Sequence, residues 1–79
     1  MPIHDGRFLE TARIHAGLTR SELWLRYFEL GGRSSPPELD AFLHGARTPT
    51  PHDHDLLVHA LNERFREQGR DHPLPYAKP

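Results

Sequence analysis

The stretch that decides the fold runs from residue 18 to residue 38 and reads LTRSELWLRYFELGGRSSPPE. It contains two capping boxes, in which a Ser or Thr N-cap and an acid three residues later satisfy two free backbone N–H groups. The boxes are Thr19-Arg20-Ser21-Glu22 and Ser35-Pro36-Pro37-Glu38, the second with proline at the first helical position, where its missing N–H costs nothing. Between them, Gly31 stands where a helix C-terminus favours glycine. The stretch therefore predicts two helices separated by a glycine turn.

The same signals recur on both sides of this stretch. Thr50-Pro51-His52-Asp53 is a third box with Asp in place of Glu, and Asp5 is a suitable cap for an earlier helix. Glycines also follow the other apolar runs, at positions 17, 45 and 69. Helices are therefore expected at 6–16, 20–30, 36–44 and 51–68, and no run shows the alternation of a strand. The predicted fold is all-α, a compact bundle of four or five helices.

Apolar side chains fall on one face of three of these segments. The three faces are formed by Phe8, Leu9, Ala12 and Ala16, by Leu39, Phe42, Leu43 and Ala46, and by Leu57, Val58, Leu61 and Phe65. The segment 20–30 differs because it is apolar nearly all round, through Leu23, Trp24, Leu25, Tyr27, Phe28 and Leu30. Such a helix either lies at the centre of the core or covers a partner. Both interpretations stay open at this point.

Chain length, composition and net charge limit the class of protein. A chain of 79 residues forms one domain at most, here residues 1–69, and the Pro-rich segment 70–79 is expected to be a disordered tail. The chain contains no cysteine, and its net charge of −1 gives no overall attraction to nucleic acid or to an anionic membrane. No apolar run reaches the roughly 18 residues of a membrane span, and the N-terminus lacks the features of a signal peptide. A cytoplasmic protein is expected.

A family resemblance appears over residues 18–62. Leu18-Thr19 opens a helix, a glycine turn and a short helix follow, and Phe42-Leu43-His44-Gly45-Ala46-Arg47-Thr48-Pro49-Thr50 precedes a segment with Leu57 and Ala60-Leu61. This order resembles the repressor-type (lambda repressor/Cro-like) helix-turn-helix domain. The resemblance implies a helix-turn-helix-like bundle in which 20–30 is the first motif helix and 36–44 the recognition helix. The first helix and its turn are longer than that family's usual spacing.

The segment 36–44 offers little to a DNA duplex. With its apolar stripe buried, Pro37, Asp40, Ala41 and His44 would point outward, and Glu38 adds a second negative charge. Base readout in the major groove favours Arg, Lys, Asn, Gln or Ser. The candidates for DNA or phosphate contact therefore bracket the helix and are Arg33, Ser34, Ser35, His44, Arg47 and Thr48. A second interpretation makes the same residues solvated turn residues and caps.

No pattern indicates catalysis or a cofactor. His52, Asp55 and His59 share one helical face and could hold a metal ion, but acids in the opening turn of a helix also favour its positive end. We expect no metal, no cofactor and no small-molecule substrate. The sequence contains no Cys nucleophile, no phosphate-cradling glycine loop and no Gly-x-Ser-x-Gly elbow, so we expect no enzyme.

Two functions follow from these patterns. The favoured one is a small, non-enzymatic regulatory module that binds a protein partner, either a transcription component or a second copy. Its interface candidates are Trp24, Leu25, Tyr27 and Phe28, since aromatic and leucine side chains supply large buried area. The alternative is a sequence-specific DNA-binding transcriptional regulator that uses residues 33–48.

Overall fold

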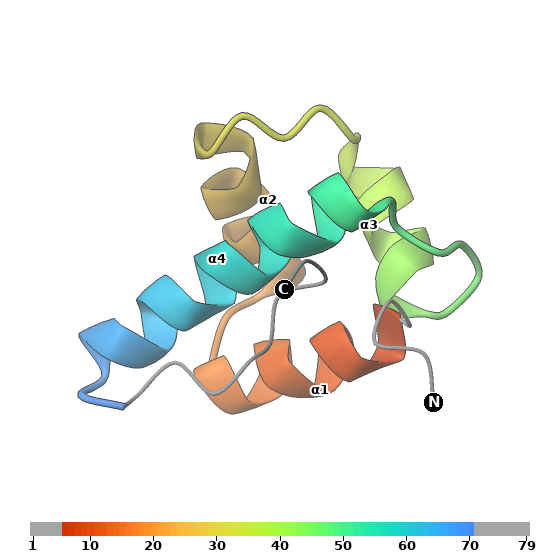
Figure 1. The fold of residues 1–79 in the computed structure, drawn as a ribbon. Helices are drawn as coiled ribbons and strands as arrows, with labels where there is room; N and C mark the ends of the chain where they lie inside the picture. Colours follow the sequence, from red (N-terminus) through yellow and green to blue (C-terminus); the bar gives the residue numbers. More distant parts are fainter. Residues whose placement is uncertain (1–5, 71–79) are drawn as a thin grey trace.

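The computed structural model describes residues 6–70, which form four helices (Figure 1). They are α1 (Gly6–Ala16), α2 (Arg20–Glu29), α3 (Pro36–Leu43) and α4 (Pro51–Glu67). Each helix starts where the sequence predicts and ends within one residue of the predicted position. Because residues 6–70 contain no strand, the predicted all-α fold is confirmed. The predicted cap Asp5 and residues 71–79 of the predicted tail lie outside the described residues.

Reciprocal capping boxes start α2 and α3, as predicted. The hydroxyl of Thr19 accepts the N–H of Glu22 at 3.0 Å, and Oε1 of Glu22 accepts the N–H of Thr19 at 2.8 Å. Ser35 and Glu38 repeat this exchange at 3.3 and 2.8 Å. Each box satisfies two backbone donors that the helix itself leaves free, so both starting points are fixed by local sequence.

The third predicted box forms only in part. Thr50 caps α4 by accepting the N–H of Asp53 at 3.1 Å, but the Asp53 carboxylate does not return to the cap. It accepts hydrogen bonds from the hydroxyls of Tyr27 and Ser34 instead, at 2.8 and 3.1 Å. The prediction of a full box was therefore wrong, because a tertiary contact takes the side chain that would have completed it.

All four helices end in the same backbone pattern. At the end of α2, the N–H of Gly31 donates to the carbonyl of Phe28 and the N–H of Gly32 to that of Tyr27, both at 3.0 Å. This Schellman pattern needs a left-handed residue, and Gly31 has a φ of +100°. Gly17, Gly45 and Gly69 close α1, α3 and α4 in the same way.

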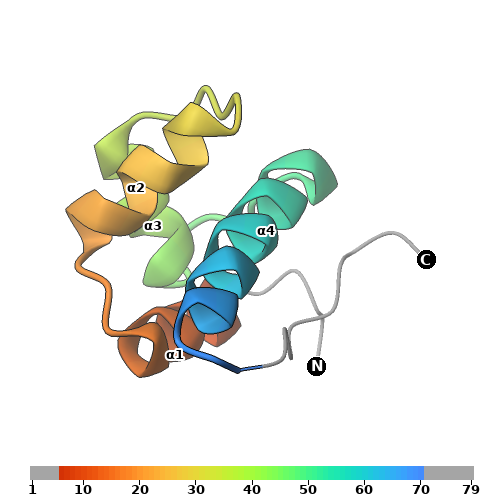
Figure 2. The ribbon, with the colours of Figure 1, turned by 90° about the vertical axis from the view of Figure 1, so that its left-hand side faces the viewer.

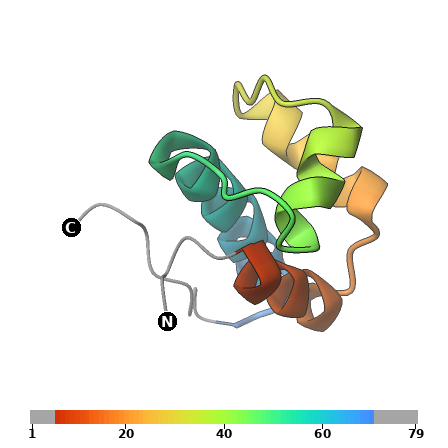
Figure 3. The ribbon, with the colours of Figure 1, turned by 90° about the vertical axis from the view of Figure 1, so that its right-hand side faces the viewer.

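The core lies where α1 and α2 each pack against both α3 and α4, an arrangement that Figures 2 and 3 show from two sides. Its fully buried apolar side chains include Leu9, Leu23, Tyr27, Leu39, Leu43, Leu57 and Leu61. The predicted inner faces are correct apart from Ala46, which is exposed because the chain turns at Gly45 before reaching it. Every helix within residues 6–70 is too short or too polar to cross a bilayer.

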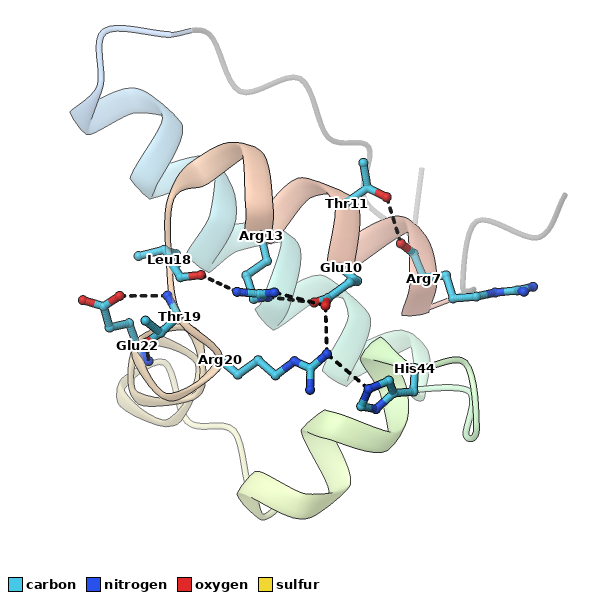
Figure 4. Close-up of polar contacts among 9 residues, drawn as sticks. All are labelled: Arg7, Glu10, Thr11, Arg13, Leu18, Thr19, Arg20, Glu22 and His44. Atoms are coloured by element: carbon cyan, nitrogen blue, oxygen red, sulfur yellow. Dashed lines mark hydrogen bonds and ion pairs between the residues drawn. The ribbon is translucent and has the colours of Figure 1, made fainter.

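Glu10 and Arg20 together link α1, α2 and the end of α3 (Figure 4). Its carboxylate accepts hydrogen bonds from Arg13 at 2.7 and 3.0 Å and from Arg20 at 2.9 Å. Hydrogen bonding from Arg13, followed by that from Arg20, lowers the pKa of Glu10 to about 2 against the opposing effect of burial. Nη2 of Arg20 also donates to Nε2 of His44 at 3.2 Å, since a guanidinium has no acceptor.

Side chains of α4 cap the last carbonyls of α1. The carbonyl of Ala16 accepts from Nε of Arg64 at 3.1 Å and from Nε2 of Gln68 at 2.9 Å. The carbonyl of His15 accepts from Nη1 of Arg70 at 3.3 Å, and the Arg70 guanidinium lies 5.3 Å from the ring centroid of Phe65. Arg70, which we predicted to open the tail, is therefore docked on the helical domain.

Candidate functional site

The outer side of α2 exposes apolar side chains. Leu25 is 52% exposed and Phe28 is 54% exposed, while Trp24 is partly buried against the core. The rings of Trp24 and Phe28 stack with centroids 5.0 Å apart and planes inclined by 18°. Positions 25 and 28 are neighbours on a helix surface, so these three side chains form one continuous surface. We call Trp24, Leu25 and Phe28 the aromatic face.

Tyr27 points the other way and does not belong to the aromatic face. It is fully buried, so our prediction of Tyr27 as an interface residue was wrong: its side chain cannot reach a partner. The two sides of α2 differ in burial. Leu23 and Tyr27 serve the core, and Leu25 and Phe28 remain in solvent.

The loop between α2 and α3 folds around the Tyr27 side chain. The Tyr27 hydroxyl accepts the N–H groups of Arg33 and Ser34 at 3.1 and 2.8 Å and donates to Asp53 of α4. Burial raises the pKa of this hydroxyl. Gly32 is buried against the same ring, and a Cβ at that position would overlap the ring atoms. The loop is therefore held by both hydrogen bonds and close packing.

This loop also forms a hydrogen bond with the aromatic face. Nε1 of Trp24 donates a 2.9 Å hydrogen bond to the carbonyl of Ser34, whose own N–H is held by Tyr27. The indole is thus fixed at its polar end and stacked on Phe28 along its ring. A surface whose side chains are already ordered loses less entropy when a partner binds.

A groove of about 590 Å³ runs beside the aromatic face, between α2 and the C-terminal half of α4. Three leucines contribute its apolar lining, Leu18, Leu25 and Leu30. Leu25 therefore belongs to both the groove and the aromatic face, which makes the two features contiguous. We call this feature the α2/α4 groove.

The charged lining of the α2/α4 groove is predominantly acidic. Four carboxylates line it against two guanidinium groups, and these are Glu22, Glu29, Glu63, Glu67, Arg26 and Arg64. Both arginines are directed to one acid: Arg26 makes two hydrogen bonds to Glu67 at 2.9 and 2.8 Å, and Arg64 lies 3.6 Å from it. These contacts, with the Arg26 hydrogen bonds first, lower the pKa of Glu67. Four carboxylates against two guanidinium groups leave the groove with an excess of two negative charges.

Two of the six DNA or phosphate candidates have structural roles. The hydroxyl of Ser34 donates to Asp53 at 3.1 Å, and that of Ser35 accepts the N–H of Glu38 as the N-cap of α3. Both side chains are half-buried. The interpretation of these serines as structural residues is the one that their contacts support.

The other candidates lie at the surface but are spread around α3. Arg33, His44, Arg47 and Thr48 are exposed. Nη1 of Arg47 lies 3.2 Å from the Glu38 carboxylate, and its guanidinium lies 6.0 Å from the ring centroid of the core residue Phe42. His44 accepts a hydrogen bond from Arg20 at 3.2 Å. Arg47 and His44 thus already have neighbours within the domain.

The outward side of α3 carries the residues that the sequence predicts. Pro37 is exposed, and Asp40 and Ala41 are half-buried at the edge of the buried stripe. The pKa of Glu38 is lowered, first by its hydrogen bond with the backbone of Ser35 and then by its hydrogen bond with the Ser35 hydroxyl. Two carboxylates on α3 would repel the phosphates of a duplex placed against it.

The histidine-rich segment does not form a metal centre in the part of the chain described. Within residues 6–70, no three His, Cys, Asp or Glu side chains are grouped closely enough to hold an ion. His52 is exposed, and Nε2 of His59 lies 3.5 Å from the carboxylate of Glu63. His54, fully buried, lies parallel to the Phe8 ring at a centroid distance of 6.5 Å.

Sequence reasoning missed the α2/α4 groove. One signal was present, since Glu22 and Glu29 are two turns apart and therefore share a helix face beside Leu25. The opposite wall comes from Glu63, Arg64 and Glu67, and only the packing of α4 against α2 places it there.

Comparisons of the chain with protein-family models, with curated proteins and with solved structures find no match.

Proposed function

We propose that this protein is a small, non-enzymatic regulatory module that binds another protein through the aromatic face of α2. The observation that carries the proposal is the exposure of Phe28 and Leu25, at 54% and 52%, beside the partly buried Trp24. Contiguous exposed apolar side chains on a domain are typical of interaction sites. Aromatic residues with ordered side chains are also the ones that contribute most to binding energy when an interface covers them.

The architecture around the aromatic face supports this proposal. Leu23 and Tyr27 hold α2 in the core, and the loop behind Trp24 is fixed to Tyr27. Phe28 lies outside the buried core to which Leu23 and Tyr27 belong. More than half of the Phe28 surface is left in solvent, where a partner can cover it.

The regulatory part of the proposal rests on the resemblance to repressor-type helix-turn-helix domains. On that resemblance, α2 and α3 correspond to the two motif helices. The acids of α3 and the internal contacts of Arg47 favour a protein partner over a DNA duplex. A transcription component and a second copy of the chain are the two partners that this scaffold suggests.

Photo-cross-linking at chosen positions tests the proposal. A photoreactive phenylalanine analogue replaces Phe28 in one variant and Ile14 in a control variant, because Ile14 is an equally exposed apolar residue on α1, at 60%. We expect defined protein adducts from position 28 in the native host cells and none from position 14. Introducing Leu25→Asp into the position-28 variant should abolish them.

Sedimentation velocity over a concentration series separates the two kinds of partner. Concentration-dependent dimers that disappear in Phe28→Asp but persist in Ile14→Asp identify a second copy as the partner. A protein that stays monomeric and yields no more adducts at position 28 than at position 14 contradicts the proposal.

A further inference from the structure

The α2/α4 groove combines an apolar floor with a charge of one sign at its edges. Leu18 is almost fully buried beneath it, whereas Leu25 rises at its outer edge with half of its surface in solvent. Residues of α2 and α4 form its walls. Grooves of this kind accept amphipathic helices that insert apolar residues at one-turn intervals.

The two arginines of the groove neutralise its four acids only in part. Arg26 and Arg64 both pair with Glu67, and no guanidinium within residues 6–70 pairs with Glu29 or Glu63. The imidazole of His59 lies 3.5 Å from Glu63 and carries a charge only when it is protonated. The walls therefore keep an excess of carboxylates over guanidinium groups, and a cation from outside can meet that excess.

Glu22 also remains ionised at the edge of the groove. Its Oε1 accepts the N–H of Thr19 at 2.8 Å, and this backbone hydrogen bond, followed by that with the Thr19 hydroxyl, lowers the pKa of Glu22. The capping box thus fixes a negative charge at one end of the groove, while Glu29 supplies another one further along α2.

We infer that the α2/α4 groove receives a cationic amphipathic helix of the protein partner. The inference rests on the proposed function, because Leu25 joins the groove to the aromatic face. Apolar side chains of that helix lie along Leu18, Leu25 and Leu30, and its lysines or arginines meet Glu29 and Glu63. Edge charges of this kind select the partner by sign and speed its association. The same carboxylates repel nucleic acid and any acidic segment.

The direct test uses a designed peptide as the probe. It is a helix of about 16 residues, or roughly four turns, with leucines on one face and lysines on both flanks. One control peptide replaces every lysine with glutamate, and another scrambles the lysine peptide so that its leucines no longer share a face. Each is titrated into the ¹⁵N-labelled full chain, and the amide shifts are mapped.

We expect the lysine peptide alone to shift the amides of Leu25, Glu29 and Glu63, while the amide of Ile14 stays unchanged. Its affinity should fall at least about tenfold between roughly 0.05 and 0.5 M salt, because screening weakens exposed charge pairs. Glu29→Gln combined with Glu63→Gln should weaken it severalfold. Asp40→Asn, which neutralises an acid on α3, should leave it unchanged.

Three results overturn the inference: equal binding of the glutamate peptide, no binding of the lysine peptide, and shifts that map to α3. Groove shifts that appear with protein concentration alone also overturn it, by making a second copy the occupant. None of these results changes the photo-cross-linked adducts expected at position 28. Failure of this inference can therefore be distinguished from failure of the proposed function.

Discussion

The hydroxyl of Tyr27 donates a 2.8 Å hydrogen bond to Oδ1 of Asp53 and thereby ties α2 to the first turn of α4. The same oxygen accepts the backbone N–H groups of Arg33 and Ser34 at 3.1 and 2.8 Å. One side-chain oxygen therefore satisfies polar groups from the loop and from α4, while its ring fills the core beneath Gly32.

Replacing Tyr27 with phenylalanine removes this oxygen and keeps the ring. The two loop N–H groups and the Asp53 carboxylate then lose a partner in a part-buried site, which costs about 1–3 kcal/mol of unfolding free energy. Urea denaturation should show that loss, and the melting temperature should fall by about 4–8 °C per kcal/mol in a domain of this size.

Thr48→Val is the matched control for loss of a hydroxyl. Thr48 is exposed, so its substitution should change the unfolding free energy by less than about 0.5 kcal/mol. A Tyr27→Phe protein as stable as the wild type would show that water can replace the phenol oxygen in the loop.

Gly32→Ala should destabilise the protein through overlap rather than backbone strain. Gly32 has no positive φ, yet its Cβ would overlap the Tyr27 ring, and overpacking of this kind costs about 1–3 kcal/mol. Gly69→Ala is the contrasting variant, because Gly69 has a φ of +77° and open space around it. Thermal melts should then report only the strain of a left-handed alanine, about 1–2 kcal/mol. Wild-type stability in Gly32→Ala would mean that the loop moves away from the ring.

Acidification should weaken the contact between α1 and α2 at Glu10. Its pKa is about 2 in the folded protein against an ordinary value of 4.5, so the folded state binds this proton less readily than the unfolded chain. The stabilisation is complete above pH 4.5 and is lost as the pH falls toward about 2. We expect its size to be about 1–2 kcal/mol once solvent screening is allowed for.

Glu10→Gln should remove this contribution at neutral pH and flatten the acid limb of a plot of unfolding free energy against pH. Glu29→Gln is the control, since no guanidinium within residues 6–70 pairs with Glu29, and its profile should follow the wild type. An unchanged acid limb in Glu10→Gln would contradict the role assigned to the Arg13–Glu10–Arg20 contact.

DNA fragments should not bind at low ionic strength. Glu38 and Asp40 lie on α3, and Arg47 is already paired with Glu38, so the attraction on which non-specific binding depends is missing there. Fluorescence anisotropy with a labelled duplex measures this directly. Salt-sensitive binding that disappears in Arg33→Ala or Arg47→Ala would revive the alternative function. Asp40→Lys reports whether the α3 surface can reach a duplex at all.

The helix boundaries could be predicted because their signals are local. Thr19 and Ser35 each exchange hydrogen bonds with an acid three residues away, and Gly31 ends α2 within its own turn. None of these contacts depends on the rest of the fold. The partial box at Thr50 marks the limit of that reasoning, since Asp53 turns toward Tyr27 of a different helix.

The two sides of α2 could not be assigned from the sequence. Tyr27 and Phe28 are adjacent aromatic residues in a helix that is apolar nearly all round, so periodicity does not separate them. Only the position of Asp53 and of the loop selects Tyr27 for the interior. The α2/α4 groove depends in the same way on the packing of α4 beside α2.

The phenol of Tyr27 also determines how the loop between α2 and α3 opens. The amides of Arg33 and Ser34 belong to a surface loop, yet both donate to an oxygen anchored in the core. Their hydrogen exchange therefore requires more than exposure of the loop to solvent. It requires both amides to leave a phenol oxygen that is itself tied to α4 through Asp53, so they should exchange more slowly than the amides at the ends of the domain.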